Sequence, residues 1–190
     1  MKASIDIGSN SVLLVAGEFQ SGKFFKDLDL SHVTGLGKGI DKTKEFAPES
    51  MEKTFKALSE YREKIKAFEI RPEEVMVTAT EASRVAKNSL DFFKKVKNEL
   101  GFNVQIINPK GEAYFSSKGV ELGNISGAPS KNILVDLGGA STEIIKFANK
   151  PYAFLDFLSL PMGSVRGTEW LEQKNLTKKL RISFTNLKIN

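Results

Sequence analysis

The sequence contains no cysteine, and His32 is the single histidine among its 190 residues. The lack of cysteine excludes disulfide bonds and thiolate metal sites, and it fits a reducing compartment. One histidine leaves little scope for histidine-based catalytic triads, and we assign it no role. The first apolar stretch is broken by Asp6 and Asn10, so we expect neither a signal peptide nor a membrane span. These absences predict a cytoplasmic protein.

The composition is that of a folded protein. Hydrophobic residues make up 41% of the chain and charged residues 27%. The formal net charge is +5, from 28 Lys and Arg against 23 Asp and Glu. A modest positive charge favours polyanionic ligands without identifying one. It indicates neither a membrane partner nor a specific nucleic acid.

Hydrophobic periodicity predicts an α/β protein in two parts. Strands are expected at 3–7, 11–19, 24–33, 75–78 and 102–107, and helices from residues 48, 81, 89 and 112. A stretch rich in Gly, Ser and Pro at 123–131 indicates a domain boundary. A hairpin over 133–147, a strand over 152–158 and a turn into a helix follow. We therefore predict domain I over 1–123 and a partial domain II over 124–190.

The hairpin Ile133–Ile145 carries an aspartate, Asp136, just before Gly138-Gly139. Apolar β-branched runs on both sides of a glycine pair are typical of two antiparallel strands joined by a tight turn. The glycines let the backbone approach a bound group, and the turn amides can point at an anion. Taken alone, the pattern is also that of an ordinary core hairpin.

A second copy of this pattern lies near the start of the chain. Asp6-Ile7-Gly8-Ser9-Asn10-Ser11 and Asp136-Leu137-Gly138-Gly139-Ala140-Ser141 share the order Asp, aliphatic, Gly, two residues, Ser. Two such hairpins facing one another would gather carboxylates, hydroxyls and amides around one cleft. Amides and hydroxyls suit phosphate oxygens, and carboxylates suit Mg²⁺. The repeat predicts metal-assisted phosphoryl chemistry between two related domains, although so short a pattern also recurs by chance.

Five ordered motifs between Ser4 and about Trp170 resemble those of one family. They are the Asp6 and Asp136 motifs, the Arg-containing segment 79–88, the helix start at Gly111-Glu112-Ala113, and the signature 159–166. On these residues the chain resembles the exopolyphosphatase/guanosine pentaphosphate phosphohydrolase (Ppx/GppA) family of the actin-like ATPase superfamily. The resemblance implies an actin-like ATPase (ribonuclease H-like) fold, with a duplicated mixed five-stranded sheet and helices and a truncated second domain.

The resemblance also implies roles for individual residues. Glu112 matches the catalytic base that activates the attacking water, and Arg84 a phosphate clamp. Asp136 and Glu143 match carboxylates that bind Mg²⁺ and place the water, with Asp6 assisting. The phosphate-binding residues would be Gly8, Ser9, Asn10, Ser11, Gly138, Gly139, Ala140 and Ser141. The structural alternatives are a helix-start carboxylate for Glu112 and a surface ion pair for Arg84.

The chain departs from the family pattern at several positions. Gly35 and Lys38 stand where an arginine and an acidic residue are usual, Gly111 replaces a paired glutamate, and Ala140 replaces a third glycine. The family continues well past Arg166, so we expect a second sheet with apolar surface left exposed.

Three functions are compatible with this pattern. The first is a Mg²⁺-dependent phosphohydrolase that releases terminal phosphate from inorganic polyphosphate or guanosine pentaphosphate, with guanosine tetraphosphate as a related ligand and a homodimer as one candidate assembly. The alternatives are an actin-like kinase or ATPase, and a truncated module that binds polyphosphate or nucleotide without catalysis.

Overall fold

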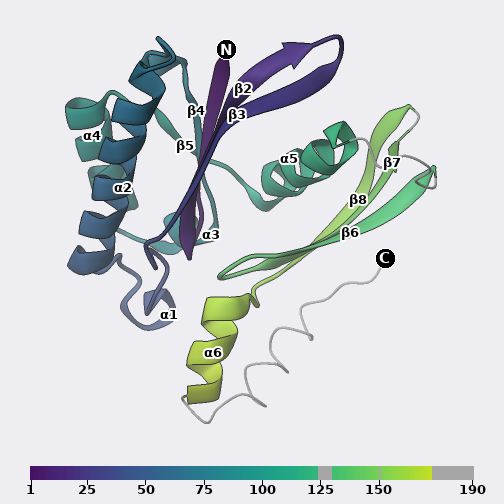
Figure 1. Cartoon of the computed structure of the whole chain (residues 1–190). Helices are drawn as coiled ribbons and strands as arrows, with labels where there is room; N and C mark the ends of the chain where they lie inside the picture. The colour runs from purple at the N-terminus through teal and green to yellow at the C-terminus, as the bar shows by residue number, and fades with distance from the viewer. Residues whose placement is uncertain (124–129, 150, 173–190) are drawn as a thin grey trace. The chain divides into compact units, whose positions relative to one another are not determined.

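The computed structural model describes residues 1–123, 130–149 and 151–172. The chain divides into two compact units, Met1–Asn108 and Pro109–Asn190, and Figure 1 labels their elements. Within the described ranges, no helix has the length and apolar character needed to cross a bilayer. The tail from Leu171 has no clear sequence pattern, and its residues from 173 onward lie outside these ranges.

The first unit is built on a mixed five-stranded sheet. Its strands are β1 (Lys2–Ile7), β2 (Ser11–Gln20), β3 (Lys23–Val33), β4 (Met76–Ala79) and β5 (Val104–Ile106), in the order β3-β2-β1-β4-β5. The pairs β1–β2 and β2–β3 are antiparallel, whereas β1–β4 and β4–β5 are parallel. This arrangement confirms the predicted α/β class with its mixed five-stranded sheet.

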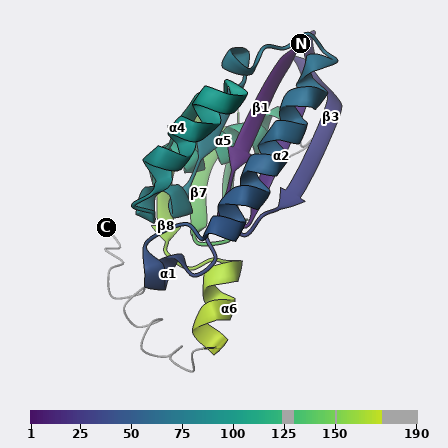
Figure 2. The same ribbon diagram turned by 90° about the vertical axis from the view of Figure 1, so that its left-hand side faces the viewer.

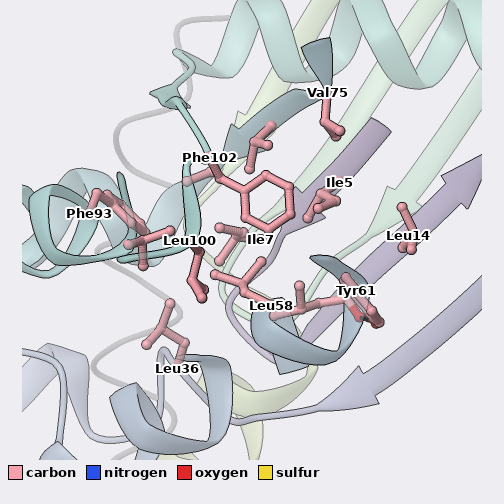
Figure 3. Packing of buried hydrophobic residues seen from close by; sticks show 14 of the residues in the cluster. Ile5, Ile7, Leu14, Leu36, Leu58, Tyr61, Val75, Phe93, Leu100 and Phe102 are labelled. Atoms are coloured by element: carbon pink, nitrogen blue, oxygen red, sulfur yellow. Dashed lines mark hydrogen bonds between the residues drawn. The ribbon is translucent and has the colours of Figure 1, made fainter. Parts of the chain in front are cut away.

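Helices cover one face of this sheet. They are α2 (Pro48–Lys66) and α4 (Ser89–Leu100), which lie side by side in Figures 1 and 2. The alternation of β1 turns Ile5 and Ile7 toward them, and both side chains are about 1% exposed. They gather with Leu58 of α2 and with Phe102 in the core drawn in Figure 3. Burial of this face is the main apolar core of the unit.

Tyr61 ties α2 to the sheet beneath it. Its hydroxyl donates a hydrogen bond to the carbonyl of Val12, at 2.7 Å, and the side chain is fully buried. Burial raises the pKa of Tyr61 to about 12, since the phenolate would lose its hydration. The hydroxyl therefore stays protonated over the ordinary pH range.

Short elements complete the first unit. They are α1 (Ile40–Thr43), η1 (Pro72–Glu74) and α3 (Glu81–Val85). The sequence did not predict α1, which follows the glycine-rich loop and begins after Gly39 in the left-handed conformation. Helix α4 begins at residue 89, as the sequence predicts, although Ser89 itself is not the cap. The N-cap is Asn88, whose side chain exchanges hydrogen bonds with the backbone of Phe46.

The second unit holds a three-stranded antiparallel sheet, β6 (Lys131–Leu137), β7 (Thr142–Asn149) and β8 (Tyr152–Leu160), with α5 (Pro109–Leu122) and α6 (Ser164–Glu172). Helix α5 packs on β7 and β8. Ala113 of α5 is fully buried, as is Ile145 of β7. The hydroxyls of Ser117 and Tyr152 are 2.9 Å apart, and the Lys118 ammonium lies 3.8 Å from the Tyr152 ring centroid.

Helix α5 therefore belongs to the second compact unit, whereas the sequence analysis placed its residues in domain I. The reason is its packing on β7 and β8. The predicted domain boundary at residue 123 stays a prediction. Helix α5 also begins at Pro109 rather than at Glu112, since proline suits the first turn of a helix, and Glu112 remains in that first turn.

Candidate functional site

The first loop, Gly8–Ser11, joins β1 to β2. The N–H of Gly8 donates to the carbonyl of Ser11 at 2.9 Å, which closes the turn. The segment after β3 lies against this loop. Gly37 donates its N–H to the Ser9 carbonyl at 2.7 Å, while Thr34 and Gly35 both donate to the Asn10 carbonyl at 2.9 Å. The loop carbonyls are thus held on one side.

The loop amides point away from these bonds. A carbonyl and the N–H that follows it share one planar trans peptide, so fixing the carbonyl turns the N–H the opposite way. Within the described residues, the N–H groups of Ser9 and Asn10 donate to no protein atom. Consecutive free amides of this kind form an anion-binding concavity. The Ser9 hydroxyl instead accepts the N–H of Ala82, at 3.3 Å, so its side chain also holds the start of α3.

The second loop, Gly138–Ser141, repeats this geometry between β6 and β7. Gly138 donates its N–H to the Ser141 carbonyl at 3.0 Å. The start of α6 holds the carbonyls, with Ser164 donating to Gly138 at 2.9 Å and Val165 to Gly139 at 2.9 Å. Within the described residues, the N–H groups of Gly139, Ala140 and Ser141 donate to no protein atom. The loop therefore presents three consecutive donors.

A glycine at each loop lets the following segment come this close. A Cβ on Gly163 would lie 2.4 Å from the carbonyl carbon of Gly139 and 2.5 Å from the nitrogen of Ala140. A Cβ on Gly37 would lie 2.8 Å from the Cβ of Ser9. Neither position accommodates a side chain without movement of the loop.

A row of polar side chains crosses the α5-covered face of the second sheet. Asp136, Glu143 and Ser159 lie directly opposite one another on β6, β7 and β8, so all three share this face. The Ser159 hydroxyl donates to the Glu143 carboxylate at 2.7 Å, and the Ser116 hydroxyl of α5 donates to Asp136 at 2.6 Å. Glu143 is only 2% exposed.

Glu112 belongs to the same neighbourhood. It precedes Ser116 by one helical turn, and residues four apart on a helix lie on the same side. Because Ser116 contacts Asp136, this face of α5 presents Glu112 toward the carboxylate row. The structure thus gathers Asp136, Glu143 and the Glu112 side of α5 within one unit.

The residues of this row have the oxygen donors that Mg²⁺ prefers. Like charges directly opposite across two strands are destabilising unless a cation or a proton compensates them. The Asp136–Glu143 pair therefore fits a divalent cation by its chemistry. Within the described residues, no three acidic or histidine side chains converge as a ready-made ligand set, so water or substrate oxygens would have to complete the coordination.

Asp6 and Arg84 belong to the first unit. The Asp6 carboxylate accepts the Thr78 hydroxyl of the neighbouring parallel strand, at 3.2 Å. Arg84 pairs with Glu81 at 2.9 Å and donates Nη1 to the Ile107 carbonyl at 2.6 Å. These bonds match the ion-pair alternative considered for Arg84. The role of Arg84 as a phosphate clamp stays a prediction.

Sequence reasoning missed several residues of the two loops and the carboxylate row. They are Gly37, Thr78, Ser116 and Thr142. Ser159, Gly163 and Arg166 lie in the signature 159–166, but their individual contacts were not predicted. One signal was available, because Ser116 follows Glu112 at helical spacing. The others depend on strand register and on contacts between distant segments. Thr142, for instance, donates its hydroxyl to the carbonyl of Met162.

Comparison with known proteins gives consistent results. A sequence profile described as the Ppx/GppA phosphatase family matches residues 28–186. A bifunctional 3-dehydroquinate synthase/phosphatase of Fusobacterium nucleatum is 34% identical over an alignment of 178 residues, which covers 89% of this chain and 26% of that protein. The chain therefore spans about a quarter of this curated relative.

Solved structures share the fold. The crystal structure of an Aquifex aeolicus Ppx/GppA family member superposes with a TM-score of 0.72 at 32% identity, covering 95% of this chain and 59% of that one. An exopolyphosphatase-like protein gives a TM-score of 0.79 at 26% identity, with 97% and 61% covered. An exopolyphosphatase from Cytophaga hutchinsonii gives 0.78 at 23% identity, with 90% and 52% covered, which shows the shared fold.

Proposed function

The chain belongs to the Ppx/GppA phosphatase family, and on this premise we propose that it releases terminal phosphate from inorganic polyphosphate or guanosine pentaphosphate with the help of Mg²⁺. Because the chain spans 59% of the Aquifex aeolicus structure and 26% of the curated relative, the activity and substrates of the whole protein are part of the proposal. The observation that carries it is the pair of loops, each with its carbonyls held on one side and consecutive amides free.

In the proposed reaction, the two loops bind phosphate oxygens through their free N–H groups. Glu112 accepts a proton from a water whose oxygen bonds to the terminal phosphorus, while the bridging P–O bond breaks and its electron pair leaves with the shortened chain. Asp136 and Glu143, with Asp6 assisting, would hold Mg²⁺, which neutralises charge on the phosphate oxygens when bound. Arg84 is the proposed phosphate clamp of the first unit.

The contacts of the carboxylate row support these roles. Ser116 donates to Asp136 and Ser159 donates to Glu143, so a hydroxyl donor orients each carboxylate. Hydroxyl donors fix the orientation of metal-binding carboxylates without neutralising them.

Phosphate release tests the proposal directly. Purified protein with Mg²⁺ is incubated with long-chain polyphosphate and, separately, with guanosine pentaphosphate. We expect release from one of them, its loss on chelation by EDTA, and a reduction of about 10²–10⁴-fold in Glu112→Gln. Glu121→Gln is the matched control, since Glu121 lies on the same helix and pairs with Lys118 at 3.2 Å. Normal turnover by Glu112→Gln would exclude Glu112 as the base.

The same preparation separates catalysis from binding. Equilibrium binding of each polyanion is measured beside release. Binding without release in the presence of Mg²⁺ would identify a binding module rather than a hydrolase, and ATP turnover coupled to an acceptor would identify a kinase.

A further inference from the structure

Arg166 contacts the second loop from behind. It lies in the first turn of α6 and is 5% exposed. Its Nη1 donates to the carbonyl of Ala140 at 2.5 Å, and its own N–H donates to the carbonyl of Gly139 at 3.1 Å. One residue thus holds two of the three carbonyls whose peptide planes set the direction of the loop amides.

In the first loop, backbone N–H groups and not a side chain hold the corresponding carbonyl. Asn10 occupies the position that corresponds to Ala140, and its carbonyl accepts the backbone N–H groups of Thr34 and Gly35. In the second loop, the Arg166 guanidinium replaces both of these backbone donors. The comparison isolates one contact, between a buried charged side chain and the Ala140 carbonyl.

We propose that Arg166 is a positioning residue for anion binding by the second loop. By fixing the Ala140 carbonyl, it turns the N–H of Ser141 toward the opposite side, where the amides of Gly139 and Ala140 also point. Its guanidinium is a cation and adds positive potential behind the loop. The inference rests on the proposed function only in that the anion is a phosphate group of the substrate.

The test follows the loop amides by nuclear magnetic resonance in a ¹⁵N-labelled protein. Tripolyphosphate is the titrant, and the variants are Arg166→Met, which removes the donors, and Arg166→Lys, which keeps the charge and one donating group. We expect Arg166→Met to shift the Ser141 amide signal in the unliganded protein. We also expect it to weaken tripolyphosphate binding about tenfold or more, with Arg166→Lys recovering part of the loss.

Two controls separate positioning from folding. Trp170→Leu disturbs a buried residue of the same helix, and Arg71→Met removes an exposed arginine of the first unit. The proposal predicts that neither reproduces the Ser141 shift. It is overturned if Arg166→Met leaves that signal and the affinity unchanged, or if Trp170→Leu matches its effects.

The proposed function and the role of Arg166 can fail separately. If the wild-type protein does not bind tripolyphosphate, the proposed function loses its support. The Ser141 signal of the unliganded variants then still decides whether Arg166 orients the loop. If Arg166→Met does not fold, as judged by far-ultraviolet circular dichroism, Arg166→Leu, which also removes the donors, takes its place, and an unmoved Ser141 signal with unchanged affinity in that variant overturns the proposal.

Discussion

The β1–β2 and β6–β7 hairpins have the same backbone geometry, but each buries the opposite face of its sheet. Their registers correspond residue for residue, so Asp6 pairs with Leu13 as Asp136 pairs with Glu143. The next strand is joined in each case through an irregularity at the corresponding place, between Ala16 and Gly17 in one and between Lys146 and Phe147 in the other. This shared geometry supports an internal duplication.

The covering helices break the correspondence. In the first unit, α2 and α4 cover the face that contains Ile5, which is 1% exposed. In the second unit, α5 covers the other face, and Val135, the counterpart of Ile5, is 60% exposed. The loops thus depend on the hairpin and on the segment that follows the third strand, and they do not depend on which face is covered.

The two carboxylate arrangements differ for a related reason. Leu13, at the position of Glu143, is 41% exposed, whereas Glu143 is 2% exposed. Of the two hairpins, the second therefore has two carboxylates directly opposite one another, on the face that α5 covers. The two loops are therefore alike in their backbone, while the pair of opposed carboxylates occurs in the second hairpin and not in the first.

The largest expected effect comes from placing threonine at two corresponding positions, one on the buried face of the first hairpin and one on the exposed face of the second. Ile5→Thr keeps the β-branched shape but removes apolar volume from the core and buries a hydroxyl, and we expect a loss of about 2–4 kcal/mol in unfolding free energy. Val135→Thr places the same residue on an exposed face and should change stability by less than about 0.5 kcal/mol. Urea denaturation followed by circular dichroism measures both.

Equal losses of unfolding free energy for Ile5→Thr and Val135→Thr would contradict the conclusion that helices cover opposite faces of the two hairpins. A loss of 2 kcal/mol or so from Val135→Thr would mean that this face is buried in solution.

Making the second hairpin like the first tests the carboxylate pair. Glu143→Leu leaves the Ser159 hydroxyl without its acceptor and removes half of the proposed cation site, so we expect phosphate release to fall by about a hundredfold or more. The reciprocal change, Leu13→Glu, adds a carboxylate at an exposed position and should leave release nearly unchanged. Retained activity in Glu143→Leu would show that the pair is dispensable.

Much of this arrangement could be predicted from the sequence. Alternation and turn residues located the strands of the first sheet, and the repeated Asp-aliphatic-Gly pattern identified both loops before any geometry was known. The contacts that stabilise the loops could not be predicted, because they join distant segments. Arg166 lies 26 residues from the carbonyl that it holds. The packing of α5 was also missed, since periodicity gives the buried side of a helix but not the sheet that buries it.

A smaller effect is expected at the glycines that face the two loops. Gly163→Ala would bring a methyl group within 2.5 Å of backbone atoms of Gly139 and Ala140, at a cost of about 1–3 kcal/mol. Gly37→Ala meets the Cβ of Ser9 at 2.8 Å and should cost less, because this contact is longer than those at Gly163. Urea denaturation followed by circular dichroism measures both variants, and the fluorescence of Trp170, the single tryptophan, on α6, follows the second unit. A larger loss of unfolding free energy for Gly37→Ala than for Gly163→Ala would contradict this order.

The smallest expected effect concerns Tyr61, whose burial between α2 and the sheet raises its pKa. Its folded-state pKa of about 12 exceeds the value of about 10 for an unfolded tyrosine. The folded state therefore holds this proton more tightly, and the resulting stability is complete below pH 10 and declines as the pH rises toward 12. Absorbance at alkaline pH should show one of the three tyrosines ionising last, and Tyr61→Phe should remove that step. If the step removed by Tyr61→Phe lies near pH 10, water reaches the phenol and the face beneath α2 is not as dry as its burial indicates.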